Sequence, residues 1–276
     1  MPTTRVPAGI LSALSFGAGD FAGAVAARRA GALVVVAGAH GIGLVALLLA
    51  ALVIQPPFPA LDGVLIGLVA GVAGAVGLAA LYRGMSLGSM GLVTALSGAG
   101  SLAIPLGVGV ILGAEASPLQ LLGVGFAAGA AVAASGASRD ELGRQALLLA
   151  GLAAVSFGAW YVLIDLAARA GDPLWALVFS RAASAGLTAV VAARRLGRGG
   201  FPMRIVAAAG LFDVGGNALY VIAREAMPVS LAAALTGMYP VVTMLLARLV
   251  LGEHLPRLGQ VGVALALVGV LLISIG

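Results

Sequence analysis

The sequence contains no cysteine and no lysine, and it has few charged side chains of any kind. Without cysteine, the chain cannot form disulfides, thiolate zinc sites or iron–sulfur clusters. Without lysine, it has neither a Walker-type phosphate loop nor a residue for Schiff-base catalysis. Only 9% of the residues are charged, whereas 62% are hydrophobic. The surface of a soluble protein of 276 residues cannot be built from so few charges, so the composition predicts an integral membrane protein.

Long apolar segments follow one another along the whole chain. A helix that crosses the hydrocarbon core needs about 20 mostly apolar residues, and ten segments meet this requirement. They show no strict alternation of polar and apolar residues, which disfavours a transmembrane β-barrel. The predicted spans are Pro7–Ala26, Ala32–Ile54, Leu61–Leu81, Ser89–Leu112, Pro118–Ala137, Ala146–Ala168, Pro173–Ala193, Met203–Ala223, Val229–Leu251 and Arg257–Gly276, with a polar break at Ser138–Arg144. The sequence therefore predicts an all-α integral membrane protein with ten transmembrane helices.

Short motifs recur between the two halves of the chain. Ser15-Phe16-Gly17-Ala18 returns as Ser156-Phe157-Gly158-Ala159, which also argues against interpreting the first span as a cleavable signal peptide. Further pairs are Leu81-Tyr82 with Leu219-Tyr220, Ala95-Leu96-Ser97-Gly98 with Ala234-Leu235-Thr236-Gly237, Leu112-Gly113-Ala114-Glu115 with Leu251-Gly252-Glu253, and Gly123 with Gly262. The offsets lie between 138 and 141. We therefore predict two five-helix repeats, 1–138 and 139–276, which cross the membrane in opposite directions because five is odd.

Arginine placement indicates the topology. Thirteen of the fifteen arginines lie outside the spans or at their first residues, whereas Arg181 and Arg248 lie deeper within spans. The odd-numbered connections hold Arg28, Arg29, Arg83, Arg139, Arg144, Arg194, Arg195, Arg198, Arg204 and Arg257, whereas the opposite side holds Arg5, Arg169 and Arg224. Basic residues favour the cytoplasmic side, so this bias predicts cytoplasmic odd connections and termini outside. The scatter of the arginines along the chain disfavours nucleic-acid binding.

The repeat, the Ser-Phe-Gly openings and the two glycine–glutamate turns resemble the EamA-type branch of the drug/metabolite transporter superfamily. Within it, the chain is similar to a bacterial group with the start Phe16-Gly17-Ala18-Gly19-Asp20-Phe21 and the segment from Leu211 to Tyr220. The resemblance covers nearly the whole chain and implies ten helices around a central cavity in the bacterial cytoplasmic membrane. Helices 1, 3, 4, 6, 8 and 9 would line the cavity, and helices 5 and 10 would lie at the periphery. Two departures are Ala114 inside the first turn and the outward termini.

Ionisable residues within the spans are candidates for function, because a charge in hydrocarbon costs at least about 2.5–3.5 kcal/mol. They are Asp20, His40, Asp165, Arg181, Asp213 and Arg248. Asp213, Asn217 and Tyr220 follow one another at helical spacing and form one polar stripe. The predicted substrate-binding residues are Phe16, Asp20, Tyr82, Ser97, Trp160, Tyr161, Asp165, Asp213, Asn217, Tyr220, Thr236 and Tyr239. Asp62, Glu115, Glu253 and His254 lie at span ends, where solvation or helix capping explains them.

Structural roles compete with these functional ones. Arg181 with Asp165 or Asp213 would form an ion pair between helices. His40 is first a neutral, hydrogen-bonded packing residue, with a proton relay as the alternative. Asp20 has no arginine within easy reach, because Arg28 and Arg29 lie about 12 Å further along the helix. It could therefore hold and release a proton or contact a substrate amine, which makes Asp20 and His40 the candidates for coupling.

Three function classes remain to be weighed. Gly84-Met85-Ser86-Leu87-Gly88 matches the nucleophile-elbow pattern but falls between two predicted helices without a catalytic base, so we expect no enzyme. Ligand spacing for a metal is missing, and we expect no cofactor. A passive channel or facilitator is the alternative to a carrier, although an inverted repeat favours alternating access. The sequence therefore predicts a secondary exporter of small metabolites such as amino acids, surrounded by lipid, with a homodimer as a candidate assembly.

Overall fold

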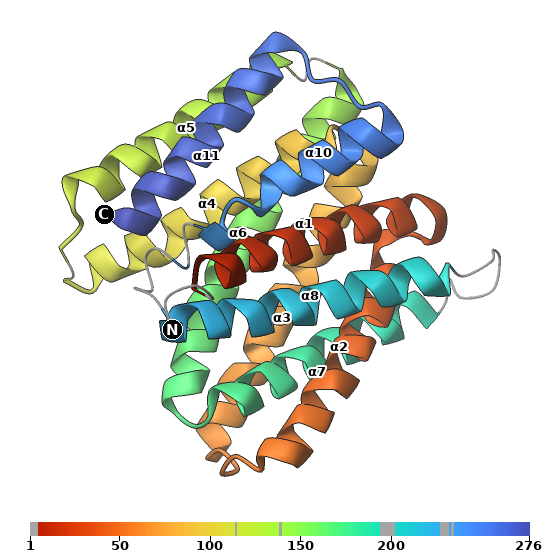
Figure 1. Ribbon diagram of the computed structural model, residues 1–276, viewed down its shortest axis with the longest axis vertical. Helices are drawn as coiled ribbons and strands as arrows, with labels where there is room; N and C mark the ends of the chain where they lie inside the picture. Colours follow the sequence, from red (N-terminus) through yellow and green to blue (C-terminus); the bar gives the residue numbers. More distant parts are fainter. Residues whose placement is uncertain (1–4, 114, 138–139, 194–201, 227–231, 233–234) are drawn as a thin grey trace.

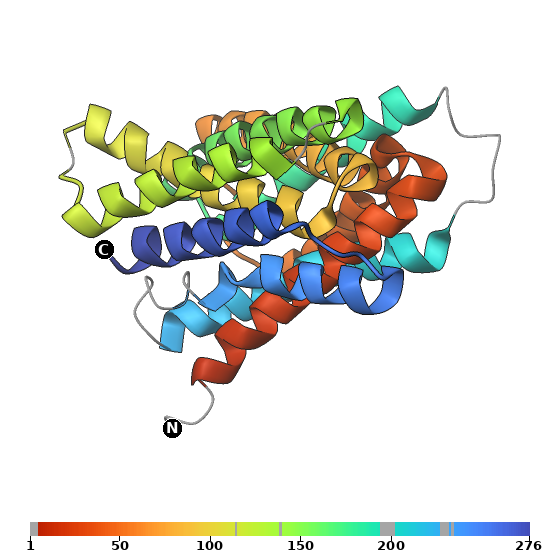
Figure 2. The ribbon, with the colours of Figure 1, turned by 90° about the horizontal axis from the view of Figure 1, so that it is seen from above.

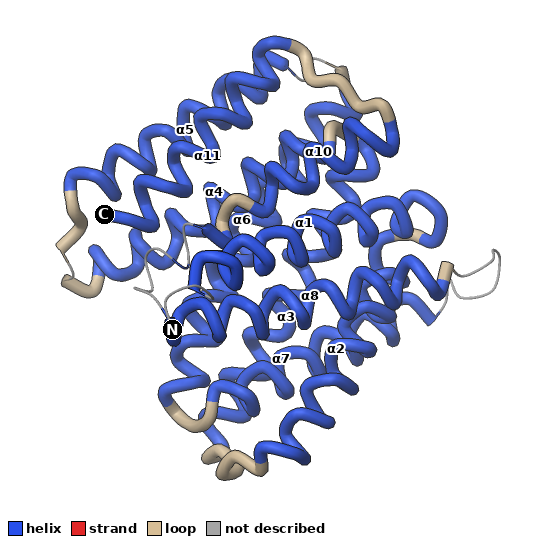
Figure 3. Tube along the Cα trace, in the orientation of Figure 1, coloured by secondary structure: helices blue, strands red, loops and turns tan. Residues whose placement is uncertain are grey.

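A computed structural model describes residues 5–113, 115–137, 140–193, 202–226, 232 and 235–276. Within these residues the fold consists of ten helices and no strand (Figure 1, Figure 3). The helices are α1 (Arg5–Ala30), α2 (Ala32–Ile54), α3 (Leu61–Leu87), α4 (Met90–Ile111), α5 (Pro118–Ala137), α6 (Glu141–Arg169), α7 (Pro173–Ala193), α8 (Met203–Ala226), α10 (Tyr239–Leu251) and α11 (Arg257–Ile275).

Eight of these helices are long and apolar enough to cross a membrane. The two others are α8, whose apolar face is interrupted by Asp213 and Asn217, and α10, which has only 13 described residues. The remainder of the predicted ninth span, together with Arg5, Arg139, Arg194, Arg195, Arg198 and Arg224, falls on residues or side chains outside the described part of the chain. The structure thus confirms the predicted all-helical class, and its apolar helices support a multi-pass membrane protein.

Two predicted boundaries are wrong because helices continue past the apolar runs. The predicted break Ser138–Arg144 is shorter, since α6 already begins at Glu141, where the Asp140 side chain accepts the Gly143 amide at 3.2 Å. The Gly84–Gly88 motif is not a connection but the last turn of α3, and Ser86 Oγ donates to the Arg83 carbonyl at 2.7 Å. A polar segment can extend a helix beyond the membrane, because water satisfies its exposed side chains.

Glycine and small residues let the helices approach closely. In the pair α3–α6, a Cβ on Gly77 would lie 2.8 Å from the Phe157 ring, and one on Gly74 would lie 3.1 Å from Trp160. In the pair α1–α8, a Cβ on Gly19 would lie 3.2 Å from Phe212. Helices α5 and α11 pack on each other at the edge of the bundle, away from α2 and α7 (Figure 1, Figure 2). The chain thus brings helices from its two halves into direct contact.

The largest buried cluster lies toward one end of the bundle. It contains the end of α1, the start of α2, the end of α3 and the starts of α4, α6 and α8, together with the end of α10. The ends of α1, α3, α5, α7 and α10 and the starts of α2, α4, α6, α8 and α11 belong to this end (right and upper right in Figure 1). We call it the arginine-rich side, because these helix ends carry Arg28, Arg29, Arg83, Arg144, Arg204 and Arg257. Toward the opposite side, neither residues 102–111 of α4 nor residues 159–166 of α6 include a buried position.

Candidate functional site

Helices α2, α7 and α8 meet at a hydrogen-bonded group of four side chains. Arg181 of α7 donates from one guanidinium nitrogen to His40 Nε2 of α2 at 2.5 Å and from the other to Asp213 Oδ2 of α8 at 2.5 Å. The other ring nitrogen of His40, Nδ1, is hydrogen-bonded to Ser184 Oγ. His40 is 2% exposed and Arg181 is 8% exposed. The buried cation therefore has both a neutralising carboxylate and a second acceptor.

The geometry sets the tautomer of His40. A guanidinium can only donate hydrogen bonds, so His40 Nε2 must be the unprotonated nitrogen and Nδ1 must carry the proton. Nδ1–H then donates to Ser184 Oγ. His40 is accordingly neutral in this arrangement, as expected for a hydrogen-bonded packing residue, and it cannot take a second proton without losing its contact with Arg181.

Asp20 lies on α1, close enough to Asp213 for the two negative charges to act on each other. Arg181 faces Asp213, and among the described residues no side chain donates a hydrogen bond to the Asp20 carboxylate. With His40 neutral, the site contains one cation, Arg181, and two carboxylates, Asp20 and Asp213. The group carries one uncompensated negative charge, which belongs to Asp20 when that residue is ionised.

Tyrosines surround the two carboxylates. The charges of Asp20 and Asp213 act on the hydroxyls of Tyr82 and Tyr161, and the charge of Asp20 also acts on Tyr239. Tyr161 in turn interacts electrostatically with Tyr220. Tyr82 is 1% exposed, and its ring packs on Gly23 of α1, whereas Tyr161 is 42% exposed. The hydroxyls come from α3, α6, α8 and α10, so the chain assembles this environment from both of its halves.

The remaining aromatic residues pack beside these tyrosines. Phe16 contacts Tyr239 edge to face, with ring centroids 6.4 Å apart, and a Cβ on Gly216 would meet its ring at 2.9 Å. Trp160 Nε1 donates to Ser180 Oγ at 3.0 Å, and its ring lies 5.3 Å from that of Tyr161. These contacts hold the rings in place.

Three smaller polar residues from the predicted set have local partners or none. Asn217 Nδ2 donates to the Asp213 carbonyl at 2.8 Å, and Ser97 Oγ donates to the Thr94 carbonyl at 3.1 Å. Thr236 Oγ1 is buried without a hydrogen-bond partner among the described residues. A Cβ on Gly98, next to Ser97, would lie 2.8 Å from the Tyr239 hydroxyl, so Ser97 and Tyr239 lie on helices that contact each other.

Asp165 does not join this group. It lies near the end of α6, where it forms an ion pair with Arg169 at 2.7 Å, and the two side chains are 59% and 74% exposed. Of the two predicted partners for Arg181, the structure selects Asp213. Arg248 is also exposed, at the end of α10. The sequence predicted Asp165 as a substrate-binding residue, but α6 carries its side chain out to the exposed end of the bundle.

Ser184 and Ser180 belong to the site but were not among the predicted residues. The sequence did contain a signal for the contact between His40 and Arg181, namely the offset between the recurring motifs. His40 and Arg181 are 141 positions apart, as are Ser15 and Ser156, and α2 and α7 also begin 141 positions apart. If the predicted repeats are correct, His40 and Arg181 occupy equivalent positions in them, and the two side chains are in contact.

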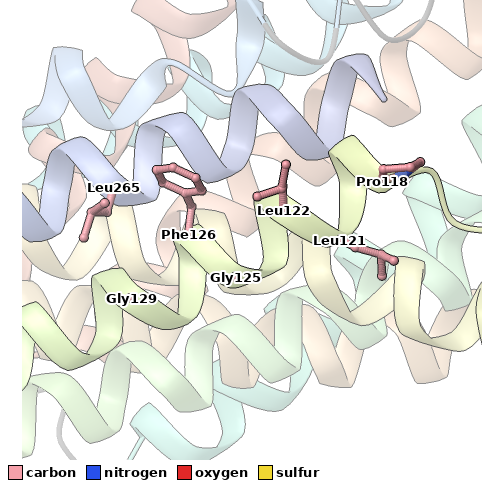
Figure 4. Close-up of a pocket in the computed structure, with 7 residues that line it drawn as sticks. All are labelled: Pro118, Leu121, Leu122, Gly125, Phe126, Gly129 and Leu265. Carbon is pink, nitrogen blue, oxygen red and sulfur yellow. The ribbon is translucent and has the colours of Figure 1, made fainter.

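A shallow groove on the described surface is separate from these residues. It has a volume of about 690 Å³, lies between α5 and α11, and is lined by Pro118, Leu121, Leu122, Gly125, Phe126, Gly129 and Leu265 (Figure 4). Every lining side chain is apolar, as expected of a surface that faces lipid. A smaller hollow of about 190 Å³ lies on the arginine-rich side, where Ser89, Asp140 and Pro256 are among its lining residues. Within the described residues, no three His, Asp or Glu side chains cluster as metal ligands would.

Comparisons with known proteins agree with this picture. Residues 144–275 match the model of the EamA-like transporter family. A solved structure described only as the crystal structure of a protein is similar over 99% of this chain and 98% of its own, with a TM-score of 0.65 and 16% sequence identity. At that identity the similarity shows the fold alone. A comparison with curated proteins found no match.

Proposed function

We propose that this chain, an EamA family membrane transporter of the drug/metabolite transporter superfamily, is a secondary exporter of small zwitterionic or cationic metabolites. Amino acids are the substrates we expect first. In this mechanism the site formed by Asp20, Arg181 and Asp213 binds the substrate and opens alternately to the two sides of the membrane.

The charge of the site carries the proposal. Arg181 is neutralised by Asp213, and Asp20 has no hydrogen-bonded cation among the described residues. Asp20 is partly buried within a predicted span. At membrane depth, a carboxylate is stabilised by a counter-charge or by a proton. A substrate ammonium group can supply the counter-charge, and a coupling proton can neutralise the carboxylate instead. Because one residue would hold either cation but not both, Asp20 can couple substrate release to proton binding.

Symmetric contacts support two inverted repeats. When the halves are exchanged, the contact α1–α8 becomes α6–α3, and the contact α2–α8 becomes α7–α3, and all four contacts exist. Helices α2 and α7 contact each other, as do α5 and α11, as helices on a twofold axis must. The contact between His40 and Arg181 is of the kind expected at such an axis. Because each repeat has five spans, an axis of this kind lies in the membrane plane.

Unequal packing at the two ends supports alternating access. The large buried cluster fills the arginine-rich side, while the opposite ends of α4 and α6 are loosely packed and Tyr161 is exposed. Denser packing of α4 and α6 on one side of the site than on the other fits one of the two states that a carrier must visit.

A transport assay tests the proposal. Purified protein in proteoliposomes loaded with an unlabelled amino acid or amine should take up the labelled compound faster than unloaded vesicles, with saturation. A thermal-shift screen of metabolites selects the compounds. Flux that neither saturates nor responds to loading contradicts a carrier and favours the channel.

Asp20→Asn provides the sharper test of the site. We expect at least about tenfold slower counterflow and a loss of the pH dependence of transport, because the amide can neither ionise nor pair with an ammonium group. Asp165→Asn is the matched control, since its carboxylate is exposed and outside the group, and it should transport like the parent. An Asp20→Asn protein with parental rate and pH profile contradicts the assigned role.

A further inference from the structure

A carboxylate from the second half of the chain holds the start of a helix in the first half. Glu253 Oε2 accepts a hydrogen bond from the Met90 amide, the first residue of α4, at 3.2 Å. One residue further, a Cβ on Gly91 would lie 2.8 Å from Met244 Cβ of α10. Met90 itself is fully buried. These contacts hold the end of α10 against the start of α4 on the arginine-rich side.

The backbone of α10 fixes where Glu253 lies. Gly252 ends the helix in the left-handed conformation, at φ 67°, and its amide donates to the Arg248 carbonyl at 3.1 Å. The Glu253 amide donates to the Ala247 carbonyl at 3.2 Å. A residue with a side chain adopts this φ at a cost, which explains the glycine. The Glu253 side chain therefore leaves a rigid helix end toward α4.

Met90 is a suitable partner for a carboxylate. The first amides of a helix have no acceptor within the helix, and the helix dipole favours a negative charge there. The chain's own cap, Ser89 Oγ, accepts from the Leu92 amide at 3.4 Å and leaves the Met90 amide to Glu253. Glu253 thus completes a cap that the first half cannot complete alone.

The equivalent residue in the first repeat is in a different situation. Glu115 lies two residues after Gly113, with Ala114 between them, whereas Glu253 follows Gly252 directly, and Gly113 also has a positive φ, of 92°. Glu115 is exposed, on the side of the bundle where α4 and α6 have few buried positions. The two corresponding glutamates therefore differ: Glu253 is engaged on the densely packed side, and Glu115 has no such contact among the described residues.

We infer that Glu253 is a gating residue of the transport cycle. Its bond to the start of α4 keeps the arginine-rich side shut in the state that the structure represents, and the bond breaks when that side opens. Glu115 has the corresponding role on the opposite side in the other state. The inference rests on the alternating access proposed above.

Cysteine accessibility tests this gate without any substrate, because the chain has no cysteine of its own. Ala150→Cys places a reporter at a position that is 1% exposed within the large buried cluster. A membrane-impermeant maleimide should label it slowly in the otherwise unchanged protein. In a Glu253→Ala background we expect labelling about tenfold faster from the arginine-rich side, which is the factor that a lost charge-assisted hydrogen bond implies. Glu141→Cys, which is exposed on the same side, verifies that the reagent reaches it.

Matched variants separate gating from helix capping. Ser89→Ala removes the chain's own cap from the same helix end without touching the contact between halves, and Glu115→Ala removes the equivalent glutamate. Neither should accelerate labelling of the Ala150→Cys reporter. Glu253→Gln keeps one acceptor oxygen without the charge, and we expect a smaller acceleration, about two- to fivefold. If Glu253→Ala does not fold, the Glu253→Gln variant replaces it in the labelling experiment.

The outcomes distinguish the gate from the function. Unchanged labelling in Glu253→Ala, or equal acceleration by Ser89→Ala, overturns the gating role even when the parent shows saturable counterflow. Faster labelling in a protein that shows no counterflow with any compound overturns the carrier and leaves the closing contact in place.

Discussion

At the scale of single residues, Arg181 organises the site because it joins its own helix α7 to His40 of α2 and Asp213 of α8. Removing one partner of a buried ion pair leaves the other charge uncompensated, at a cost of about 3–5 kcal/mol. Asp213 is partly exposed, so the cost for its pair with Arg181 is smaller, and solvent screens the fully exposed pair of Asp165 with Arg169. These two aspartate–arginine pairs therefore differ in consequence.

His40 provides a residue-scale prediction. His40→Gln offers Arg181 an amide oxygen in place of Nε2, whereas His40→Leu leaves that donor without a partner. We expect His40→Gln to retain most of the counterflow rate with the parental pH profile, and His40→Leu to lose at least about tenfold. The pH profile decides between the two roles of His40: a relay residue would carry the pH dependence, and its loss in His40→Gln would contradict the positioning role.

At the scale of elements, glycines determine how closely helices pack. A Cβ on Gly71 of α3 would clash with the Ser180 carbonyl of α7 and lie 2.7 Å from Ala183 Cβ, so the two backbones would have to separate. This displacement would also reach Arg181, which follows Ser180. The contact between α3 and α7 is thus coupled to the position of the buried cation.

We expect Gly71→Ala to destabilise the protein by about 1–3 kcal/mol, as overpacking does. The measurement is the midpoint of thermal unfolding in detergent. Gly41→Ala and Gly125→Ala are the controls, because nothing lies within 4 Å of a Cβ at either position. Equal midpoints for all three variants would mean that α3 and α7 can separate without cost.

At the scale of the whole molecule, the ten-helix arrangement and the arginine bias predict orientation. Positive residues favour the cytoplasmic side, and the connections rich in arginine lie at the densely packed end. On this predicted orientation, the state with a closed arginine-rich side would be closed to the cytoplasm and open outward.

Fusions of a reporter enzyme that is active only in the cytoplasm test this orientation. A reporter placed after Gly276 should give no signal, and one inserted in the connection between α7 and α8 should give a strong signal. Signal from the C-terminal fusion would reverse the assigned topology and, with it, the side to which the structure opens. The Glu253 contact would be unaffected, since it is defined by the helices and not by the membrane.

The sequence by itself determined the membrane location, the helical class and most helix starts, because hydropathy and helix length are properties of consecutive residues. Three predicted spans, Ala32–Ile54, Pro118–Ala137 and Pro173–Ala193, coincide with α2, α5 and α7. It also placed Asp20, Arg181 and Asp213 within spans. The second-repeat boundary at 139 and the inward or outward placement of the termini stay predictions.

Only the tertiary structure decided which of these residues meet. Helical spacing tells which side chains share one face of a helix, but not which face of another helix lies opposite. The packing of the helices paired Arg181 with Asp213 and His40. It also left Asp165 exposed at the end of α6 and brought Glu253 to the start of α4. These contacts join residues from distant parts of the chain, so their partners depend on how the helices pack and not on any local pattern.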